Sequence, residues 1–352
     1  MIVLVIVAVA IIAYSVYAGQ PGSAAPSSIA TSDSTSEVST QGTATSLVAT
    51  STASGTGSDL TTTLTSGNSS VGVTESTVAG PIKHVIIIVM ENEPYGNVIG
   101  NPSAPYENSL ASQYAIASDY FAVSHPSLPN YLALVAGSTF GVTTDCLPNQ
   151  CSVPGPTIAS LLDSHGLSWR EYAESMPANC SQTDSSDGLY VARHDPFVYF
   201  SSITNNTGSG ITSVYCDSHA VSFSQFWTDL QASNLPNYSI ITPNICDDAH
   251  SCPLSTGDAW LSTVIPRIVN SSSFASTAVF VVYDEGSGSA PNTTSQVTCI
   301  LVSPFAKDGF VSSAYYTHYS LLATVEAIFG LGSLGRNDAN ATVMSDMLTI
   351  GI

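Results

Sequence analysis

The sequence predicts an α/β protein, a three-layer sandwich in which helices cover both faces of a mostly parallel central sheet. The first observation is a set of short apolar runs rich in β-branched residues, at 84–90, 239–242, 278–283 and 297–302. The second is the set of helix-like segments between or after these runs, at 157–165, 223–232 and 320–329. Continuously apolar runs are typical of strands buried on both faces, and strands alternating with helices predict a parallel sheet between helical layers.

The first 80 residues differ in composition from the rest. Residues 2–18 are almost continuously apolar, which is typical of a signal peptide cut after Ala18 or of a membrane anchor, and both interpretations stay open. Residues 19–80 are dominated by Ser, Thr, Gly and Ala and predict a disordered stalk, because they cannot bury enough apolar surface to offset chain entropy. We therefore expect one folded domain over residues 81–352.

The cysteines and sequons predict an extracellular or cell-surface glycoprotein. Residues 1–18 are the candidate membrane tether. Six of the seven cysteines fall into local pairs, and Cys299 lies in an apolar run as a buried free thiol. The expected disulfides are Cys146–Cys151, Cys180–Cys216 and Cys246–Cys252. The sequons of the folded part are at Asn179, Asn205, Asn237, Asn270 and Asn292.

The net charge argues against nucleic acid and anionic membranes as binding partners. A formal net charge of −20 with only six Lys and Arg repels nucleic acid and anionic lipid head groups. The sequence gives no reason to expect a protein partner.

Two pairs of polar residues, each with at least one acid, follow two of the predicted strands. Glu91-Asn92 comes after the run at 84–90, and Asp284-Glu285 comes after the run at 278–283. In parallel sheets ligands bind at the carboxyl ends of strands, so these pairs are candidate functional groups. A single such pair is more often a solvated turn.

Ser127 is a candidate nucleophile. It lies in the segment 125–130, directly before an apolar helix-like stretch at 131–136, where helix N–H groups attract anions. The alternative is an ordinary helix N-cap.

The loop between Cys246 and Cys252 holds Asp247, Asp248 and His250. A small disulfide loop can hold catalytic groups rigidly, whereas an acidic turn or a calcium-binding surface loop is the alternative. His194 and His318 are further candidates that could simply form local hydrogen bonds.

Taken in order, these motifs resemble the phosphoesterase family of acid phosphatases and phospholipase C enzymes, a branch of the alkaline-phosphatase superfamily. The spacing is closer to the acid-phosphatase members, and the resemblance spans residues 81–340. The segments that carry it are 84–92, 125–131, 193–197, 235–238, 242–250, 283–285, 317–320 and 334–336. The resemblance implies an alkaline-phosphatase-like fold.

The family's functional positions can be carried over to this chain. Ser127 matches the nucleophile, which also touches the metal. The metal positions match Glu91, Asn92, Asp284 and Glu285, and the phosphate-contacting positions match Asn130, His194 and His250, with His125 a further member. All four metal positions offer hard oxygen donors, which favours magnesium, calcium or manganese over a thiolate zinc site. The identity of the one divalent ion stays open among magnesium, calcium, manganese and zinc.

The resemblance thus implies a metal-dependent acid phosphatase that acts on a small phosphorylated substrate. In-line attack by Ser127 would give a phosphoserine, with His250 or His194 protonating the departing alkoxide. Protonated imidazole predicts an acidic optimum. Two alternatives remain: a phospholipase C-type phosphodiesterase with the same serine and metal, and a non-catalytic surface protein on the same fold.

Overall fold

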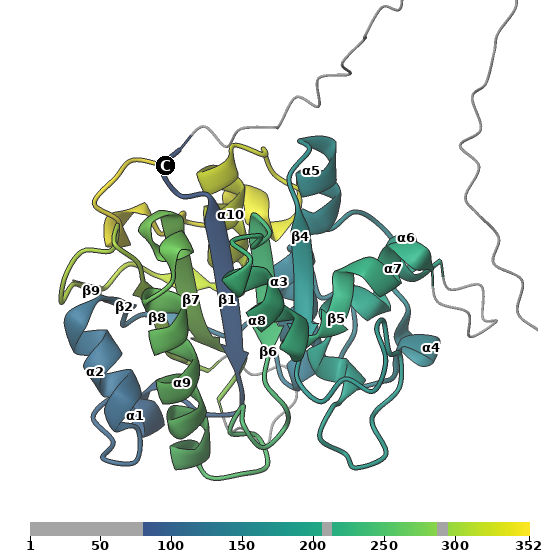
Figure 1. The fold of residues 1–352 in the computed structure, drawn as a ribbon, viewed down its shortest axis with the longest axis horizontal. Helices are drawn as coiled ribbons and strands as arrows, with labels where there is room; N and C mark the ends of the chain where they lie inside the picture. Colours follow the sequence, from purple (N-terminus) through teal and green to yellow (C-terminus); the bar gives the residue numbers. More distant parts are fainter. Residues whose placement is uncertain (1–79, 206–212, 287–294) are drawn as a thin grey trace, which may run out of the picture. The chain divides into compact units, whose positions relative to one another are not determined.

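An eight-stranded sheet forms the centre of the part of the chain that this computed structural model describes, residues 80–205, 213–286 and 295–352 (Figure 1). The strand order is β5-β4-β6-β1-β7-β8-β2-β9. Every pairing is parallel except those of β8 with β7 and β2, which confirms the predicted mostly parallel sheet. The strands are β1 (His84–Met90), β2 (Ala115–Ala117), β4 (Trp169–Ala173), β5 (Ala220–Ser222), β6 (Tyr238–Thr242), β7 (Thr277–Tyr283), β8 (Cys299–Val302) and β9 (Val311–Ser312).

The register of the central strands decides where the site lies. Strand β1 pairs with β7 from His84↔Thr277 to Met90↔Tyr283, so the two strands end side by side. Both are buried along almost their whole length, because helices cover both faces. Glu91 and Asp284, the next residues along the chain, therefore emerge together at the carboxyl edge of the sheet.

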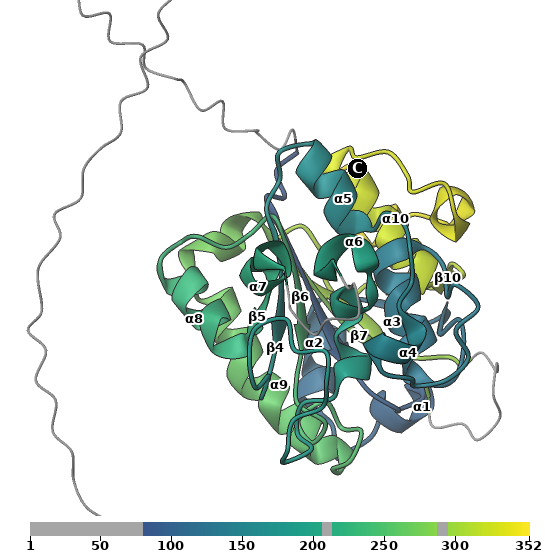
Figure 2. The same cartoon turned by 90° about the vertical axis from the view of Figure 1, so that its right-hand side faces the viewer.

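Helices form a layer on each face of the sheet. Figure 2 shows α8 and α9 on one face, and α3, α5 and α10 on the other. A two-stranded parallel sheet of β3 (Tyr120–Phe121) and β10 (Tyr316–Thr317) precedes α3 and α10. The helices are α1 (Tyr95–Val98), α2 (Pro105–Gln113), α3 (Ser127–Ala136), α4 (Pro148–Cys151), α5 (Ile158–Ser164), α6 (Ser201–Thr204), α7 (Val214–His219), α8 (Phe223–Gln231), α9 (Leu254–Val269) and α10 (His318–Phe329).

Three predicted boundaries were wrong by a few residues. The helix expected at 131–136 begins at Ser127, since Pro129 is tolerated in a first turn. The helix expected from 320 begins at His318, where a Thr317–Ser320 capping box closes its N-terminus. The strand expected from 297 begins at Cys299, because Val297 pairs with Pro94 in an isolated bridge.

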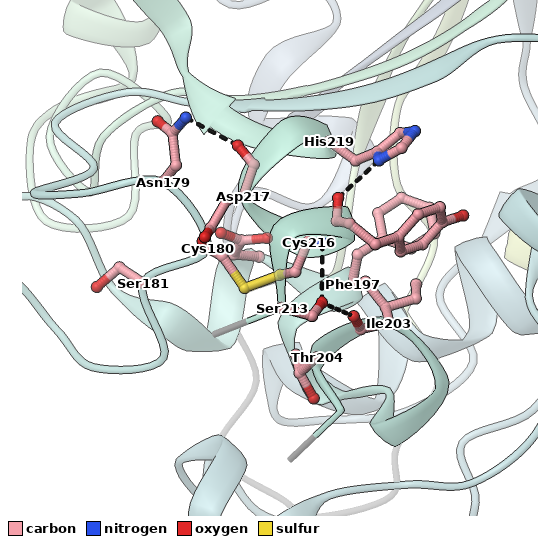
Figure 3. The surroundings of a disulfide bond; sticks show 12 residues. Asn179, Cys180, Ser181, Phe197, Ile203, Thr204, Ser213, Cys216, Asp217 and His219 are labelled. Atoms are coloured by element: carbon pink, nitrogen blue, oxygen red, sulfur yellow. Dashed lines mark hydrogen bonds between the residues drawn. A yellow bond between two sulfur atoms is a disulfide. The ribbon is translucent and has the colours of Figure 1, made fainter. Parts of the chain in front are cut away.

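The three predicted disulfides are present, and Cys299 is free and buried. Figure 3 shows the Cys180–Cys216 bond, which joins the loop after β4 to helix α7. Close to it, the exposed Asn179 side chain donates a hydrogen bond to the carbonyl of Asp217 at 2.8 Å.

The predicted sequons differ in their surroundings. Asn179, Asn205 and Asn270 are exposed. Asn237 is half-buried, and its Nδ2 donates to the carbonyl of Lys83 at 3.0 Å, so its amide is engaged in the fold. Asn292 lies outside the described residues.

The N-terminal predictions also fall outside the described residues. The signal peptide or anchor at 1–18 and the stalk up to residue 79 are not covered. Within the described ranges, none of the helices combines the length and the apolarity needed to cross a membrane.

Candidate active site

The site is built on the adjacent ends of β1 and β7. The Asp284 N–H donates to the carbonyl of Met90 at 2.9 Å, which ties the two strand ends together. The Asp284 carboxylate in turn accepts hydrogen bonds from the backbone N–H groups of Asn92 at 3.2 Å and Glu285 at 2.6 Å. Both predicted acidic pairs therefore belong to one structure rather than to two solvated turns.

Helix α3 brings the candidate nucleophile to these carboxylates. The Ser127 hydroxyl lies 3.0 Å from Glu91 Oε2 and 3.4 Å from Glu285 Oε1. One helical turn later, on the same face of α3, the Tyr131 hydroxyl donates to Glu91 Oε1 at 2.6 Å. Ser127 is buried and does not cap the helix, whose N-cap is Pro126. Its hydroxyl is directed at the acidic cluster instead.

Asn130 fixes the loop that leads into α3. Its Oδ1 accepts hydrogen bonds from the backbone N–H groups of Val123 and Ser124, both at 3.0 Å. Its Nδ2 donates to the carbonyl of Ser124 at 3.0 Å and lies 3.5 Å from Glu285 Oε2. The amide therefore has a positioning function in this structure, and its contact with phosphate stays a prediction.

His125 also joins the cluster. Its Nδ1 lies 2.6 Å from Glu285 Oε2, and its side chain is 23% exposed whereas that of Glu285 is 1% exposed. A protonated His125 would balance part of the negative charge of Glu285 at the opening of the site.

Asp248 holds both predicted phosphate-contacting histidines. Its Oδ2 lies 3.1 Å from His194 Nδ1, and its Oδ1 accepts the backbone N–H of His250 at 2.7 Å. The Asp248 carbonyl accepts the N–H of Glu91 at 2.9 Å, which joins the Cys246–Cys252 loop to the end of β1. Asp248 is buried and points inward, so this loop is neither a plain acidic turn nor a surface calcium loop.

His194 lies between Asp248 and Glu91. Its Nε2 is 3.2 Å from Glu91 Oε1, and its ring stacks on Tyr131 with centroids 5.3 Å apart. The His250 ring lies 5.6 Å from the His194 ring and is less buried. Burial lowers the pKa of His194 to about 3, and the nearby positive charge of Arg193 contributes to this.

His318 contacts the backbone of Asp284. Its Nε2 lies 2.5 Å from the carbonyl oxygen of Asp284, and its Nδ1 lies 3.0 Å from the Tyr120 hydroxyl. Because a carbonyl can only accept, Nε2 carries the proton and Nδ1 accepts from Tyr120. The alternative of a merely local hydrogen bond therefore does not apply to His318, since both partners are distant in sequence.

The carboxylates of the site are crowded and buried. Burial raises the pKa of Glu91 well above its ordinary value, and the negative charges of Asp284 and Asp248 add to this effect. Burial likewise raises the pKa of Asp284 to about 7, and that of Glu285 to about 9 with the help of the Asp284 charge. This cluster contains too few positively charged groups to balance its carboxylates.

A divalent cation fits this cluster. The Oδ2 atom of Asp284 is buried and has no hydrogen-bond partner among the described residues. The side chains of Ser127, Glu91 and Glu285 also offer oxygen atoms as metal ligands. A second possible ligand group also exists: atoms of Glu91, His194 and His250 lie within 4.8 Å of one another. Its imidazole nitrogens would suit zinc better than the oxygen set does.

An ion pair of Asp145 and Arg193 adjoins the first turn of α3 through its acid. Asp145 Oδ1 accepts the backbone N–H of Leu128 at 3.0 Å, and its Oδ2 lies 3.7 Å from Arg193 Nε. Asp145 lies beside the Cys146–Cys151 disulfide, and Arg193 precedes His194 in the short 3-10 helix Ala192–His194.

Sequence reasoning missed Tyr131 and Asp145, which contact the predicted site, and it named Asp248 and His318 only as candidates without a defined role. Tyr131 could have been found, because it follows Ser127 by four positions in a predicted helix. Asp248 lay in the singled-out disulfide loop. No pattern in the sequence indicated that Asp145 would meet the first turn of α3.

Comparisons with known proteins agree with the predicted family. The model of the Phosphoesterase family matches residues 101–332. The chain is 35% identical to a phosphatidylinositol-3-phosphatase of Mycobacterium tuberculosis, over 75% of this chain and 82% of that protein. It is 34% identical to an acid phosphatase of Aspergillus fumigatus, over 72% of this chain but only 56% of that protein, so it spans little more than half of this fungal relative.

The fold also has solved counterparts. A protein of the alkaline phosphatase superfamily from Vibrio parahaemolyticus is 14% identical with a TM-score of 0.51, covering 76% of this chain and 72% of that one. At this identity the likeness concerns the fold alone, and it confirms the predicted alkaline-phosphatase-like architecture. Since the family model covers most of the domain and both of these relatives carry phosphatase names, the chain belongs to the Phosphoesterase family, a family of phosphoric ester hydrolases.

Proposed function

We propose that the chain is a metal-dependent acid phosphatase that hydrolyses phosphomonoesters with Ser127 as its nucleophile. The observation that carries the proposal is the position of the Ser127 hydroxyl between Glu91 and Glu285, 3.0 and 3.4 Å from their carboxylate oxygens. A serine in this setting, at the start of a helix and among buried acids, is placed for chemistry on an anion rather than for capping. The names of both relatives also indicate monoester substrates.

Glu91, Asn92, Ser127, Asp284 and Glu285 would hold the metal ion. When bound, a divalent cation supplies positive charge that favours the ionised serine and the negative oxygens of the phosphoryl group. The chain's own contribution is to fix these donors: Tyr131 holds Glu91, and the N–H groups of Asn92 and Glu285 hold Asp284.

The ionised form of Ser127, whose hydroxyl proton has passed to solvent, would attack phosphorus through Oγ in line with the ester oxygen, forming the O–P bond of a phosphoserine as the bond to the alcohol breaks. His250 is the better candidate to protonate the departing oxygen, because its ring is only partly buried. His194 is buried, and its low pKa of about 3 keeps it neutral, which suits a group that positions or hydrogen-bonds the phosphate. Water then hydrolyses the phosphoserine, with the same imidazole accepting the proton.

We further propose that the enzyme acts outside the cell. Three disulfides support an oxidising compartment, and the scarcity of basic residues agrees with an acidic exterior. Secretion and tethering through residues 1–18 are both compatible with this location.

The test is hydrolysis of nitrophenyl phosphate by the full-length protein between pH 3 and 8, with chelator and then with magnesium, calcium, manganese or zinc. We expect an acidic optimum and loss of turnover with chelator. Ser127→Ala should abolish turnover while the unfolding temperature stays close to that of the wild type. The control is Ser262→Ala, an exposed serine on α9, which should keep full activity.

Acid quenching during turnover should leave phosphate on the peptide that contains Ser127, detected by mass spectrometry. Full activity in Ser127→Ala would refute the nucleophile. Activity on bis-nitrophenyl phosphate that exceeds activity on the monoester would favour the diesterase alternative, and no turnover with any metal would favour the non-catalytic one.

A further inference from the structure

Arg193 differs from the other basic residues of the chain in its surroundings. Arg170 pairs with Asp229, Arg267 stacks on Trp227, and Lys307 lies over Phe310. Arg336 donates to the carbonyls of Ala136 and Pro156, and Lys83 precedes β1 at the opposite edge of the sheet from the site. Arg193 is thus the basic residue of the six that borders the predicted phosphate-binding histidines.

The Arg193 guanidinium is placed close to the site but is incompletely bonded. Its buried Nε–H has no hydrogen-bond acceptor among the described residues, because Asp145 Oδ2 at 3.7 Å is too far away. Its charge is felt by the site, since it contributes to lowering the pKa of His194 and of His250. A buried donor without an acceptor is costly and is usually satisfied by a partner.

Asp145 shows that an anion can occupy the space beside Ser127. Its carboxylate accepts the N–H of Leu128, the residue after the nucleophile, at the positive end of the ten-residue helix α3. The same carboxylate faces Arg193. A phosphoryl group on or near Ser127 would need these donors, so Asp145 occupies at rest a position that phosphate would take in turnover.

We propose that Arg193 determines specificity for phosphomonoesters, by leaving its resting partner Asp145 to bind the second negative charge that a monoester carries and a diester lacks. This inference rests on the proposed function and names the substrate class of the same site. A guanidinium matches two phosphate oxygens at once, which a lysine ammonium does not. Binding of the dianion by Arg193 would offset the repulsion from the acids around it.

The difference in charge between a phosphomonoester and a phosphodiester provides the test. A phosphomonoester gains its second charge with a pKa of about 6, whereas a diester keeps one charge throughout. In the full-length protein, Arg193→Gln should therefore lower kcat/KM for nitrophenyl phosphate by about tenfold or more at pH 7, but much less at pH 4. Its effect on bis-nitrophenyl phosphate should be small at both values, and Arg193→Lys should recover part of the loss.

Arg267→Gln is the matched control, since it removes an equal charge from an exposed position on α9 and should change neither substrate. Asp145→Asn can keep the hydrogen bond from Leu128 while it removes the competing charge. We expect it to raise the affinity for inorganic phosphate several-fold at pH 7.

Calorimetric titration with inorganic phosphate tests the inference without turnover. Weaker phosphate binding by Arg193→Gln at pH 7, with a smaller change at pH 4, is the expected result. Equal losses at both pH values, an equal loss for the diester, or unchanged phosphate affinity would overturn the inference, as would weaker binding by Asp145→Asn. If phosphate binds as expected but no ester is hydrolysed, the proposed function fails and the recognition by Arg193 stands.

Discussion

Asp248 connects three parts of the site, and its position in the sequence did not indicate this. Its two carboxylate oxygens hold the ring of His194 and the backbone of His250, and its carbonyl holds the end of β1 at Glu91. Burial raises the pKa of Asp248 to about 7, and above that pH its ionised carboxylate accepts the Nδ1–H of His194, which leaves Nε2 beside Glu91 without a proton. Asp248 is therefore a positioning residue that fixes one tautomer of His194.

Asp248→Asn should lower kcat about tenfold to a hundredfold, with a smaller change in KM. The reason is that the new amide can donate to His194 Nδ1 and so move the proton to Nε2, beside Glu91. The measurement is the pH profile of kcat and KM on nitrophenyl phosphate. An unchanged profile would contradict the tautomer argument.

The matched control is Asp247→Asn, one residue earlier in the same disulfide loop. Asp247 Oδ2 accepts from the side chain of Asn244 at 2.7 Å and makes no contact with His194. This variant should change kcat by less than about threefold. An equal loss in both variants would indicate a general disturbance of the loop rather than the loss of a positioned imidazole.

At the scale of elements, the sequence predicted the central strands β1, β6 and β7 and the helices α3, α5, α8 and α10, because their apolar composition indicates burial, but it missed α9, the longest helix described. Strands β1 and β7 are apolar throughout and buried on both faces. The short strands β2, β5 and β9, and the inner strand β4 between β5 and β6, could not be predicted in this way. Strand β4 reads WREYA, and its polar residues find partners only in the folded chain: Arg170 pairs with Asp229, and Glu171 is buried near Asp195.

The same reasoning explains which site residues were found. Residues at the ends of strongly apolar strands, such as Glu91 and Asp284, could be placed because the strand fixes their position. Asp145 and His318 come from a loop and from a helix start, and only tertiary packing brings them to Leu128 and Asp284. Sequence spacing carries no information about such contacts.

The disulfides should stabilise the domain to different degrees. Cys180–Cys216 closes a loop with a separation of 36 residues, whereas Cys146–Cys151 closes one of only 5. In the chain-entropy account the longer loop stabilises by about 4 kcal/mol and the shorter by about 2 kcal/mol. Replacing both cysteines of each pair by alanine should therefore lower the unfolding temperature more for the first pair (Figure 3).

Activity below the unfolding temperature separates stability from function in these variants. Residues 180 and 216 lie away from Ser127 and its partners, so kcat should stay within about twofold in that double variant. Loss of the 146–151 bond should affect kcat more, because Asp145 adjoins it and contacts the first turn of α3. The opposite order in either measurement would contradict this assignment.

At the scale of the whole molecule, buried acids link stability to acidic conditions. Outside the site, burial raises the pKa of Glu107 to about 8 and that of Glu326 to about 8, and it raises the pKa of Glu171 as well. Only six Lys and Arg oppose 26 Asp and Glu, which leaves a formal net charge of −20. Protonation therefore relieves both the burial of single carboxyl groups and the repulsion among all of them.

Glu107 allows this link to be measured. It is fully buried, and its Oε1 accepts the Tyr283 hydroxyl at 3.0 Å, while Oε2 has no partner among the described residues. The folded protein keeps the proton up to about pH 8, whereas the unfolded chain releases it near the ordinary value of 4.5. Between these values the folded state binds more protons, so the free energy of unfolding falls as the pH rises from about 4.5 to 8.

Glu107→Gln imitates the protonated side chain and should remove this part of the pH dependence. The variant and the wild type should be similarly stable at pH 4.5, whereas at pH 8 the variant should be more stable by about 4 kcal/mol. Denaturant unfolding in the presence of chelator measures the difference, because metal binding at the site then contributes to neither protein. Asp308→Asn, which removes an exposed carboxylate, controls for the simple loss of negative charge and should leave the slope almost unchanged. Parallel stability curves for Glu107→Gln and the wild type would show that Glu107 is ionised in the folded protein, and the preference for acidic conditions would then have to come from the other buried acids, namely Glu326, Glu171 and the active-site carboxylates.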